Sequence, residues 1–441
     1  MTLIRAFRAF GILTLSLPVF AQYAGPAILS RGEAPAALSE DQISFRPYLE
    51  LAGIYDTGLA GIIVNSQGNG QNETAYGMEL VGGVSGAHSW RHTKIGLDYQ
   101  VSVRHYNQNS YYDGINQSLL LGITHQFTRH TLLSLREDAG EFSGNYGFPG
   151  LTSTVPFDPA TSFVPTTDFF DNRVIYASTQ ADFTIQKSAR LSFDLGGDGF
   201  LTRRRSTALY GVTGGGARAD MQYRLSRYST IGAGYSYEHF DFTRVFSSTD
   251  LHSFVGTYAR AITQHLEFTG YAGVMRYETK FIQSVPVDPA IVALFGITQG
   301  AQVLYTVGTT PTINARLSRT FREGVASVSG GRSILPGNGL FLTSTVNTGM
   351  ASYAYTGLRR WSMDASLMYS SADSQAGLTG HYSDLAATFT VSRQINRGFH
   401  AVASFGAHRY ASPTHTNYNQ IFYMARIGFG WTPGDVPLRV W

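Results

Sequence analysis

The chain of 441 residues contains no cysteine, and only 14% of its residues are charged. Without cysteine there is no disulfide bond, no thiolate metal ligand, no catalytic thiol and no lipoprotein anchor. A soluble protein of this length usually has two or three domains, in which about a quarter of the residues are charged. The low charge therefore argues against an ordinary soluble multidomain protein.

Long hydrophobic runs are also missing from most of the chain. After Ala21, no segment reaches the roughly 18 consecutive apolar residues that predict a membrane-spanning helix. The segment before it has the pattern of a secretory signal peptide: Arg5 and Arg8 form a basic region, Ala9 to Val19 is apolar, and a small-x-small cleavage site ends at Ala21. We therefore predict an exported chain without a helical anchor.

Charge of one sign is not in excess either. The sequence has 33 basic and 30 acidic residues, and loss of Arg5 and Arg8 with the signal peptide leaves a net charge near +1. This balance gives no reason to expect a nucleic-acid partner. What the chain does have is 48 glycines, 13% aromatic residues and a mean hydropathy of −0.08. This composition is typical of a large membrane barrel, in which lipid-facing and lumen-facing residues average out.

The clearest strand pattern lies between Gln420 and Trp431, with the sequence QIFYMARIGFGW. Every second residue from Ile421 to Trp431 is apolar, and this face is aromatic towards both ends. The other face is mixed and carries Arg426 in its middle. A tilted strand that crosses a bilayer has this pattern, because Tyr and Trp settle at the two headgroup levels.

Segments of similar length and alternation follow one another along the rest of the chain. We predict 18 strands, at 45–56, 75–87, 93–105, 115–126, 131–142, 173–186, 190–202, 211–225, 230–242, 250–262, 266–278, 310–320, 325–334, 344–357, 361–371, 383–394, 399–410 and 420–431. Sixteen strands is the alternative, because 211–225 and 325–334 are rich in glycine and weakly patterned.

Short and long connections alternate between these segments. Thr128-Arg129-His130 is a short polar turn, whereas Thr57–Thr74 is a long loop. Periplasmic turns and longer external loops give outer-membrane barrels this asymmetry. A charge on the lipid face would cost about 2–4 kcal/mol at mid-membrane, so the polar faces must point inward, and a ring this wide leaves room for water. We therefore predict an all-β fold, a closed antiparallel transmembrane β-barrel; a soluble sandwich or propeller is the alternative.

From Phe45 to Trp431 the chain resembles porin-like outer-membrane β-barrels, in pattern and architecture rather than through a diagnostic motif. The resemblance implies an outer-membrane location, contact with membrane lipid and lipopolysaccharide, and insertion by the barrel-insertion machinery. In that family an aromatic residue at the end of the last strand is part of the insertion signal. The candidates here are Tyr423, Phe429, Trp431 and Trp441.

We divide the chain into a signal peptide (1–21), a mobile periplasmic extension (22–44), the barrel (45–431) and a C-terminal tail (432–441). The extension is rich in Ala, Pro, Gly and Ser and has no period. Pro433-Gly434 and Pro437 break the strand in the tail. We therefore favour the end of the last strand as the insertion signal, over an extension formed by Leu438, Val440 and Trp441.

Patterns for catalysis and for metal binding are absent from the sequence. Neither Gly-x-Ser-x-Gly nor His-Glu-x-x-His occurs. His400 and Ser404 share one face of a strand, but four residues of strand separate them by roughly 13 Å. The run from Gly196 to Gly199 lacks the carboxylates of a calcium loop, and we interpret it as structural, inside a strand. We predict no catalytic residue, no metal and no cofactor.

The third external loop, Ser143–Asn172, is the candidate pore constriction. In general porins this loop folds inward, and acidic loop residues opposite basic wall residues would set a transverse field in the channel. The acidic candidates are Asp158, Asp168 and Asp171, and the basic candidates on the polar faces of their strands are Arg104, Arg136, Arg218, Arg224, Arg316 and Arg426. The alternative is an ordinary surface loop.

Two other external segments have a distinct character. Asp288-Pro289 is a good helix start, so a short apolar helix is expected up to Phe295. This helix could cap the barrel mouth or touch lipopolysaccharide or a partner, and a capped mouth would argue against a general pore. Arg203-Arg204-Arg205 could pair with lipopolysaccharide phosphates or remain solvated.

These observations predict passive passage of small polar solutes through a water-filled lumen, without covalent chemistry. The alternative function is a barrel partner of an exopolysaccharide or export system, since the first strand, Arg46 to Asp56, faintly resembles the opening of such barrels. A barrel enzyme is third. The sequence leaves a homo-oligomer open.

Overall fold

The structure is a computed structural model. It describes residues 46–57, 74–107, 113–143, 173–207, 209–287, 292, 295, 296, 298–337, 339, 342–355, 357, 358, 360–375, 380–396, 398–411 and 421–432.

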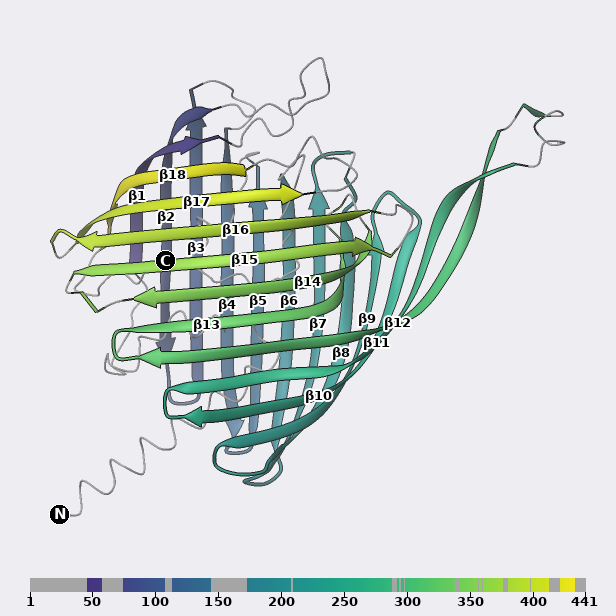
Figure 1. The fold of residues 1–441 in the computed structure, drawn as a ribbon. Coiled ribbons are helices and arrows are strands. Elements are labelled where there is room, and N and C mark those ends of the chain that lie inside the picture. The colour runs from purple at the N-terminus through teal and green to yellow at the C-terminus, as the bar shows by residue number, and fades with distance from the viewer. Residues whose placement is uncertain are drawn as a thin grey trace.

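Eighteen strands form one closed antiparallel barrel (Figure 1). They are β1 (Arg46–Asp56), β2 (Ala75–Ser89), β3 (Thr93–Tyr106), β4 (Gly114–Thr128), β5 (Thr131–Phe142), β6 (Val174–Gln186), β7 (Leu191–Arg204), β8 (Val212–Arg224), β9 (Ser229–Phe242), β10 (Ser247–Thr263), β11 (Leu266–Pro286), β12 (Gln299–Phe321), β13 (Gly324–Pro336), β14 (Thr343–Tyr355), β15 (Trp361–Ser374), β16 (His381–Gln394), β17 (Phe399–Ala411) and β18 (Ile421–Trp431). Each strand pairs with its neighbours in sequence, and β1 pairs with β18 to close the ring.

The prediction of 18 strands is confirmed, and the alternative of 16 is wrong. The two weakly patterned segments are β8 and β13, which pair with both of their neighbours. The strands at the front of the barrel cross those at the back at a steep angle (Figure 1). Strands tilted by about 35–45° from the barrel axis produce this crossing.

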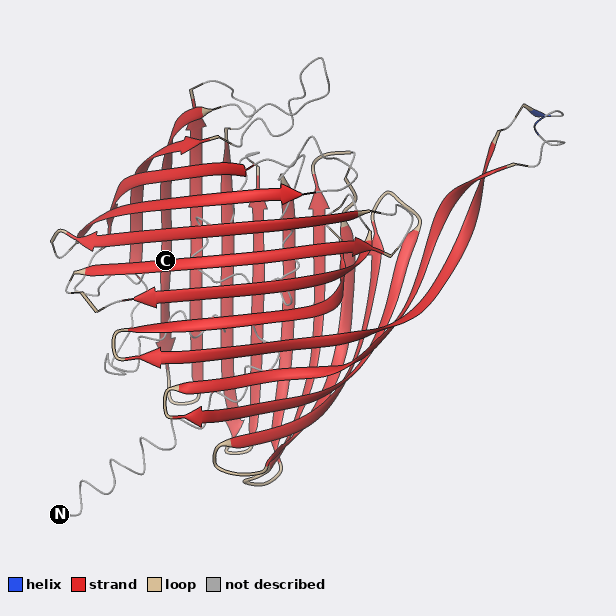
Figure 2. Cartoon of the chain, in the orientation of Figure 1, coloured by secondary structure: helices blue, strands red, loops and turns tan. Residues whose placement is uncertain are grey.

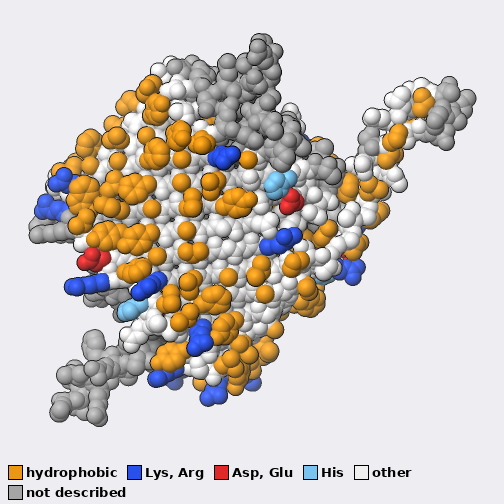
Figure 3. All heavy atoms as spheres, in the orientation of Figure 1, with side chains coloured by type: hydrophobic (Ala, Val, Ile, Leu, Met, Phe, Trp, Pro, Cys, Tyr) orange, Lys and Arg blue, Asp and Glu red, His pale blue; other side chains and the backbone are white. Residues whose placement is uncertain are grey.

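The two faces of the wall differ as the alternation predicts. In β18, Ile427 is 70% and Phe429 is 63% exposed, whereas Arg426, which precedes Ile427, is 6% exposed. The cross-strand register joins outward residues to outward residues around the ring, as in Leu51 opposite Leu80 and Phe429. Hydrophobic side chains accordingly predominate on the outer face of β10–β18 (Figure 3). This exterior suits lipid, and the polar residues face inward.

The wall departs from the predicted strand ends at β11 and β12, which contain 21 and 23 residues. Much of the segment between the predicted strands 266–278 and 310–320, which was expected to be a long loop, is therefore strand, and that prediction is wrong. Its Gly, Gln and Pro residues concealed an alternation that continues through Val303, Tyr305 and Val307. The two strands form a ribbon that projects from the barrel (Figures 1 and 2).

Candidate functional site

The inward wall holds a compact charge cluster where the barrel closes. Glu50 on β1, Glu79 on β2, Arg104 on β3 and Arg426 on β18 come from four adjacent strands. Arg104 Nε donates to Glu79 Oε1 at 2.7 Å. Arg426 Nε lies 2.7 Å from Glu79 Oε2, and Arg426 Nη2 lies 2.9 Å from Glu50 Oε1. We call this the seam cluster.

Burial makes the balance of the seam cluster important. The side chains of Arg104 and Glu79 are fully buried, and Arg426 is 7% exposed at its side chain. Two guanidinium groups and two carboxylates compensate each other there. Removing one partner of such a group leaves an uncompensated buried charge, which is costly. The seam cluster therefore ties the first and last strands together and projects little net field into the lumen.

A second part of the inner wall is acidic. On β6 to β9 the inward residues include five carboxylates: Asp182, Asp194, Asp198, Asp220 and Glu238. Away from the strand ends, Arg218 is the one guanidinium group on this described face, while Arg204 and Arg224 end β7 and β8. We call this surface the acidic wall.

Hydrogen bonds hold part of the acidic wall in place. Arg218 pairs with Asp182, and Gln180 Nε2 donates to Asp182 Oδ2 at 3.2 Å. Thr184 and Gln222 donate to Asp194, the latter at 3.1 Å. Within the described chain, Glu238 Oε1 is buried and accepts no hydrogen bond. One guanidinium group does not compensate the four aspartates of this surface, so the acidic wall is negative on balance.

Glycines on the inward face give these side chains room. A Cβ at Gly196 would lie 2.3 Å from Asp182 Oδ1 and 2.7 Å from Arg218 Nε. Its neighbour Gly197 faces outward, where the nearest atom to such a Cβ is at 3.5 Å. Gly196 and Gly197 lie inside β7, in agreement with the structural interpretation of this run.

An apolar cluster lies at the outer end of the inner wall. Its buried members are Phe200, Val212, Phe240, Phe242, Leu251, Phe281, Ile334 and Leu342. Ile334 lies near the end of β13 and Leu342 precedes β14, so the described part of the connection between these strands packs inward onto β7–β11. Tyr210 N donates to Gly339 O at 2.9 Å, which joins this turn to the loop after β7.

Buried threonines fix the same turn. Thr249 Oγ1 lies 2.5 Å from Thr343 Oγ1 and 3.1 Å from Thr279 Oγ1. Gln375 N donates to Thr343 O at 2.8 Å, and Tyr277 Oη donates to Gln375 Oε1 at 3.1 Å. The described part of the connection between β13 and β14 thus narrows the outer mouth of the barrel.

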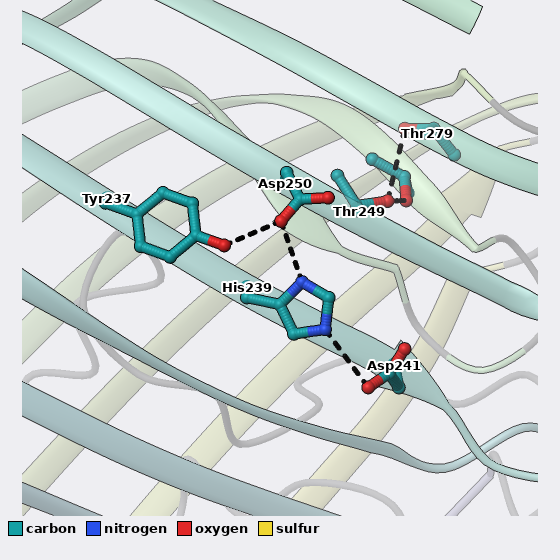
Figure 4. A network of polar contacts seen from close by, with 7 residues as sticks. Tyr237, His239, Asp241, Thr249, Asp250 and Thr279 are labelled. Carbon is teal, nitrogen blue, oxygen red and sulfur yellow. Dashed lines mark hydrogen bonds and ion pairs between the residues drawn. The ribbon is translucent and has the colours of Figure 1, made fainter. Parts of the chain in front are cut away.

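A third polar network lies on the outward side of β9 and β10 (Figure 4). Tyr237 Oη donates to Asp250 Oδ1 at 2.7 Å. His239 Nδ1 lies 2.9 Å from Asp250 Oδ1, and its Nε2 lies 3.2 Å from Asp241 Oδ2. Charged groups on the outside of the wall mark the level at which the apolar belt gives way to headgroups and water.

The predicted constriction is only partly described. Asp158, Asp168 and Asp171 lie outside the described residues. The six wall arginines do not converge on one site: Arg104 and Arg426 belong to the seam cluster, Arg218 to the acidic wall, and Arg224 to its edge, while Arg136 and Arg316 lie on β5 and β12. The constriction by the third loop stays a prediction.

The other sequence predictions have mixed outcomes. Tyr423, Phe429 and Trp431 face outward on β18, which ends at Trp431. Their role in insertion stays a prediction, and Trp441 lies outside the described residues. Val292 and Phe295 are helical at the tip of the ribbon (Figure 2), away from the barrel mouth, which was one of the positions left open for this helix.

The sequence analysis did not single out these carboxylates as candidate site residues. The alternation in each strand already placed Asp182, Asp194, Asp198 and Asp220 on polar faces. An inventory of inward charges along β6–β9 would have found the acidic wall. The contacts of Glu79 could not be found in this way, because they depend on closure between β1 and β18.

The described residues contain no grouping that fits a metal ion and no helix that could span a membrane. No group of three or more His, Asp or Glu side chains there is arranged to hold a metal ion. No helix in the part of the chain that the structure describes is long and apolar enough to cross a membrane. On the inner wall His400 and Ser404 are 1% and 6% exposed and belong to one strand.

The closed antiparallel ring, its apolar exterior and its polar interior define the class of protein. The chain is a bacterial outer-membrane β-barrel.

No protein-family model and no curated protein matches the chain. Solved structures with a similar fold include Pseudomonas aeruginosa OpdQ, with a TM-score of 0.39, 11% identity and coverage of 89% of this chain and 98% of that chain. Acinetobacter baumannii OccAB3 has a TM-score of 0.36, 11% identity and coverage of 88% and 99%. The copper transporter OprC has a TM-score of 0.43, 9% identity and coverage of 89% and 66%. Values this low carry no argument about function.

Proposed function

We propose that this barrel is a passive channel for small polar solutes, with a preference for cations over anions. The observation that carries the proposal is the acidic wall, where the inward carboxylates outnumber the one mid-strand guanidinium group, that of Arg218. A wide antiparallel barrel has a polar interior that water can enter. In such a lumen an excess of one charge raises the local concentration of the opposite ion.

The seam cluster is balanced, so it does not oppose the field of the acidic wall. The proposal needs no covalent step. Selectivity would come from wall charge and from the size of the outer mouth, where Leu342 and Thr343 lie against the inner wall.

Single-channel recording tests this proposal. The chain from Gln22 to Trp441 would be reconstituted in planar bilayers, with a potassium chloride gradient across the membrane. We expect steady ohmic steps and a reversal potential whose sign corresponds to potassium permeation. A reversal potential of the opposite sign would contradict the cation preference but keep the pore.

A second function is favoured by one observation, the apolar packing at the outer mouth. If that packing closes the lumen, the barrel would serve as a membrane partner of an exopolysaccharide or export system without a pore of its own. Folded, heat-modifiable protein that gives no current would support this second function and contradict the channel. A conductance that appears only after the turn between β13 and β14 is shortened would point the same way.

A further inference from the structure

The wall of the barrel divides between β12 and β13. In the described chain, their pairing ends where Ile313 lies opposite Arg332. Beyond that point β12 stays paired with β11 alone, in the ribbon that stands clear of the barrel (Figure 1), and β13 stays paired with β14 alone. If the register continued, Pro311 would lie opposite Ile334, and a proline has no N–H to extend the ladder.

Beyond the division, β13 lies inside its neighbours rather than beside them. Val328 and Ile334 lie on the same side of β13, because their separation along the strand is even. Val328 is 58% exposed on the outer surface, whereas Ile334 is 1% exposed. Ile334 belongs to the apolar cluster that contains Leu251 of β10 and Phe281 of β11, whose side chains point inward. The outward side of this end of β13 therefore faces the inner side of β10 and β11, and the wall overlaps itself.

We call the overlapping end of the β13–β14 hairpin the strap. It consists of residues 333–336 of β13 and 343–346 of β14, which pair with each other. One edge of the strap pairs with no strand in the described chain, and the other edge is paired with β15. The strap is thus a corner of the sheet with one free edge. Segments with fewer backbone partners open at a lower free energy than fully paired ones.

Two glycines lie where the strap meets the wall. Gly330 of β13 pairs with Gly349 of β14, just before the division. A Cβ at Gly349 would meet no atom within 4 Å, so packing does not require a glycine there. Glycines that face each other allow both strands of the hairpin to bend at the same level. This position suits a hinge.

Uncharged contacts hold the strap against β10 and β11. Thr249 Oγ1 lies 2.5 Å from Thr343 Oγ1, and Gln375 N donates to Thr343 O at 2.8 Å. Ile334 and the adjoining Leu342 add apolar packing. The strap therefore lies across the outer mouth, with a threonine contact at the point where it meets β10.

We propose that the strap is a gate at the outer mouth, hinged at Gly330 and Gly349. Where it lies against β10 and β11, it narrows the mouth. When Thr343 leaves Thr249 and the hairpin bends at the hinge, the mouth widens. This inference rests on the proposed channel function, because a gate acts only on a lumen that conducts.

The absence of cysteine allows the strap to be locked by a disulfide bond. The double variant Thr249→Cys, Thr343→Cys places two thiols where the hydroxyl groups now touch. The matched control Ser327→Cys, Ser352→Cys joins β13 to β14 on the other side of the hinge, where the two Oγ atoms lie 2.7 Å apart. In planar bilayers the oxidised first variant should lose the open steps, and a phosphine reductant should restore them. The control should conduct equally before and after reduction.

The same recordings separate the gate from the channel. If the oxidised Thr249→Cys, Thr343→Cys variant, with its disulfide verified by mass, conducted as well as the reduced protein, the gate would be overturned and the channel kept. Absence of current from the wild type and from the reduced variants would contradict the channel itself.

Thiol labelling tests the movement of the strap without any current. Ile334→Cys places a thiol in the strap, and Ile54→Cys is its control, because Ile54 is 4% exposed in a separate apolar cluster on the inner side of β1. We expect a water-soluble maleimide to react faster with Ile334→Cys than with Ile54→Cys. Equal rates would overturn the movement of the strap and with it the gate.

Discussion

The seam cluster and the acidic wall lie on the same inner surface, but charges are balanced in the first and predominantly negative in the second. At the seam, two arginines and two glutamates are buried and compensate each other. On β6–β9, five carboxylates share one mid-strand arginine, Arg218, and four of the five are only partly buried. The first arrangement suits closure of the ring, and the second suits a field in the lumen.

This difference in charge balance follows from the positions of the strands in the sequence. β1 and β18 meet only when the chain is complete, so the closing contact benefits from strong, specific partners across it. β6 to β9 are consecutive hairpins that need no such partners, since local turns set their register. Charge on these strands is therefore available for function.

The largest effect is expected from breaking the balance of the seam cluster. Glu79→Gln removes the carboxylate that contacts both Arg104 and Arg426, and it leaves two buried guanidinium groups facing one glutamate. We expect a loss of about 3–5 kcal/mol in the free energy of unfolding, because one partner of a buried ion pair is removed. Denaturant titration followed by heat-modifiable mobility measures this loss.

A matched control tests whether the loss depends on the balance of buried charges or follows from neutralising any carboxylate. Asp241→Asn makes the same kind of neutralisation on the outward side of β9, where the Asp241 side chain is 64% exposed. We expect a change of less than about 1 kcal/mol there, as for other exposed pairs. A similar loss for Glu79→Gln and Asp241→Asn would show that the seam cluster has no special part in closure.

Much of the barrel could be predicted from the sequence because its signals are local. An alternation of period two, the short turns and the long loops each depend on neighbouring residues, and they placed β1 and β18 to within a residue. The charged contacts depend on register between strands. Arg426 was recognised as inward, but its pairing with Glu50 and Glu79 requires the closing contact of β18 with β1.

The outer mouth shows a second limit of sequence reasoning. Leu342 and Thr343 follow a Gly-rich turn that has no period, and nothing in the turn itself predicts that it bends onto Phe240 and Thr249. The ribbon was missed for a related reason. Its Gly, Gln and Pro residues are common in loops, and only pairing with β11 shows that Gln299–Thr312 is strand.

Neutralising aspartates of the acidic wall should affect stability less, but it should clearly change the ion selectivity of the channel. The triple variant Asp194→Asn, Asp198→Asn, Asp220→Asn removes three negative charges and leaves the Arg218–Asp182 pair intact. We expect the reversal potential in a salt gradient to move towards zero or to change sign, because the field in the lumen loses its acidic excess. Planar-bilayer recording measures this shift.

The same variant sharpens the comparison with the seam cluster. Its free energy of unfolding should fall by less than that of Glu79→Gln, since no buried cation loses its partner. Asp241→Asn again serves as the control, because its charge lies outside the wall. An unchanged reversal potential in the triple variant would mean that these carboxylates do not face the path of the ions.

The smallest expected effect concerns the space that the acidic wall needs. Gly196→Ala would put a Cβ against the Asp182 carboxylate and the Arg218 side chain, whereas Gly197→Ala points outward and meets only ordinary contacts. The obstructing atoms at Gly196 are the ends of flexible side chains, so we expect a loss of about 1 kcal/mol rather than a failure to fold. Gly197→Ala should be neutral or slightly stabilising, since alanine restricts the unfolded chain. Because Gly196→Ala displaces the ion pair without removing a charge, its cation preference should change less than that of the triple variant. Equal stability of the two alanine variants would show that the wall side chains can move aside freely, and that their positions on the wall are not fixed by the glycine.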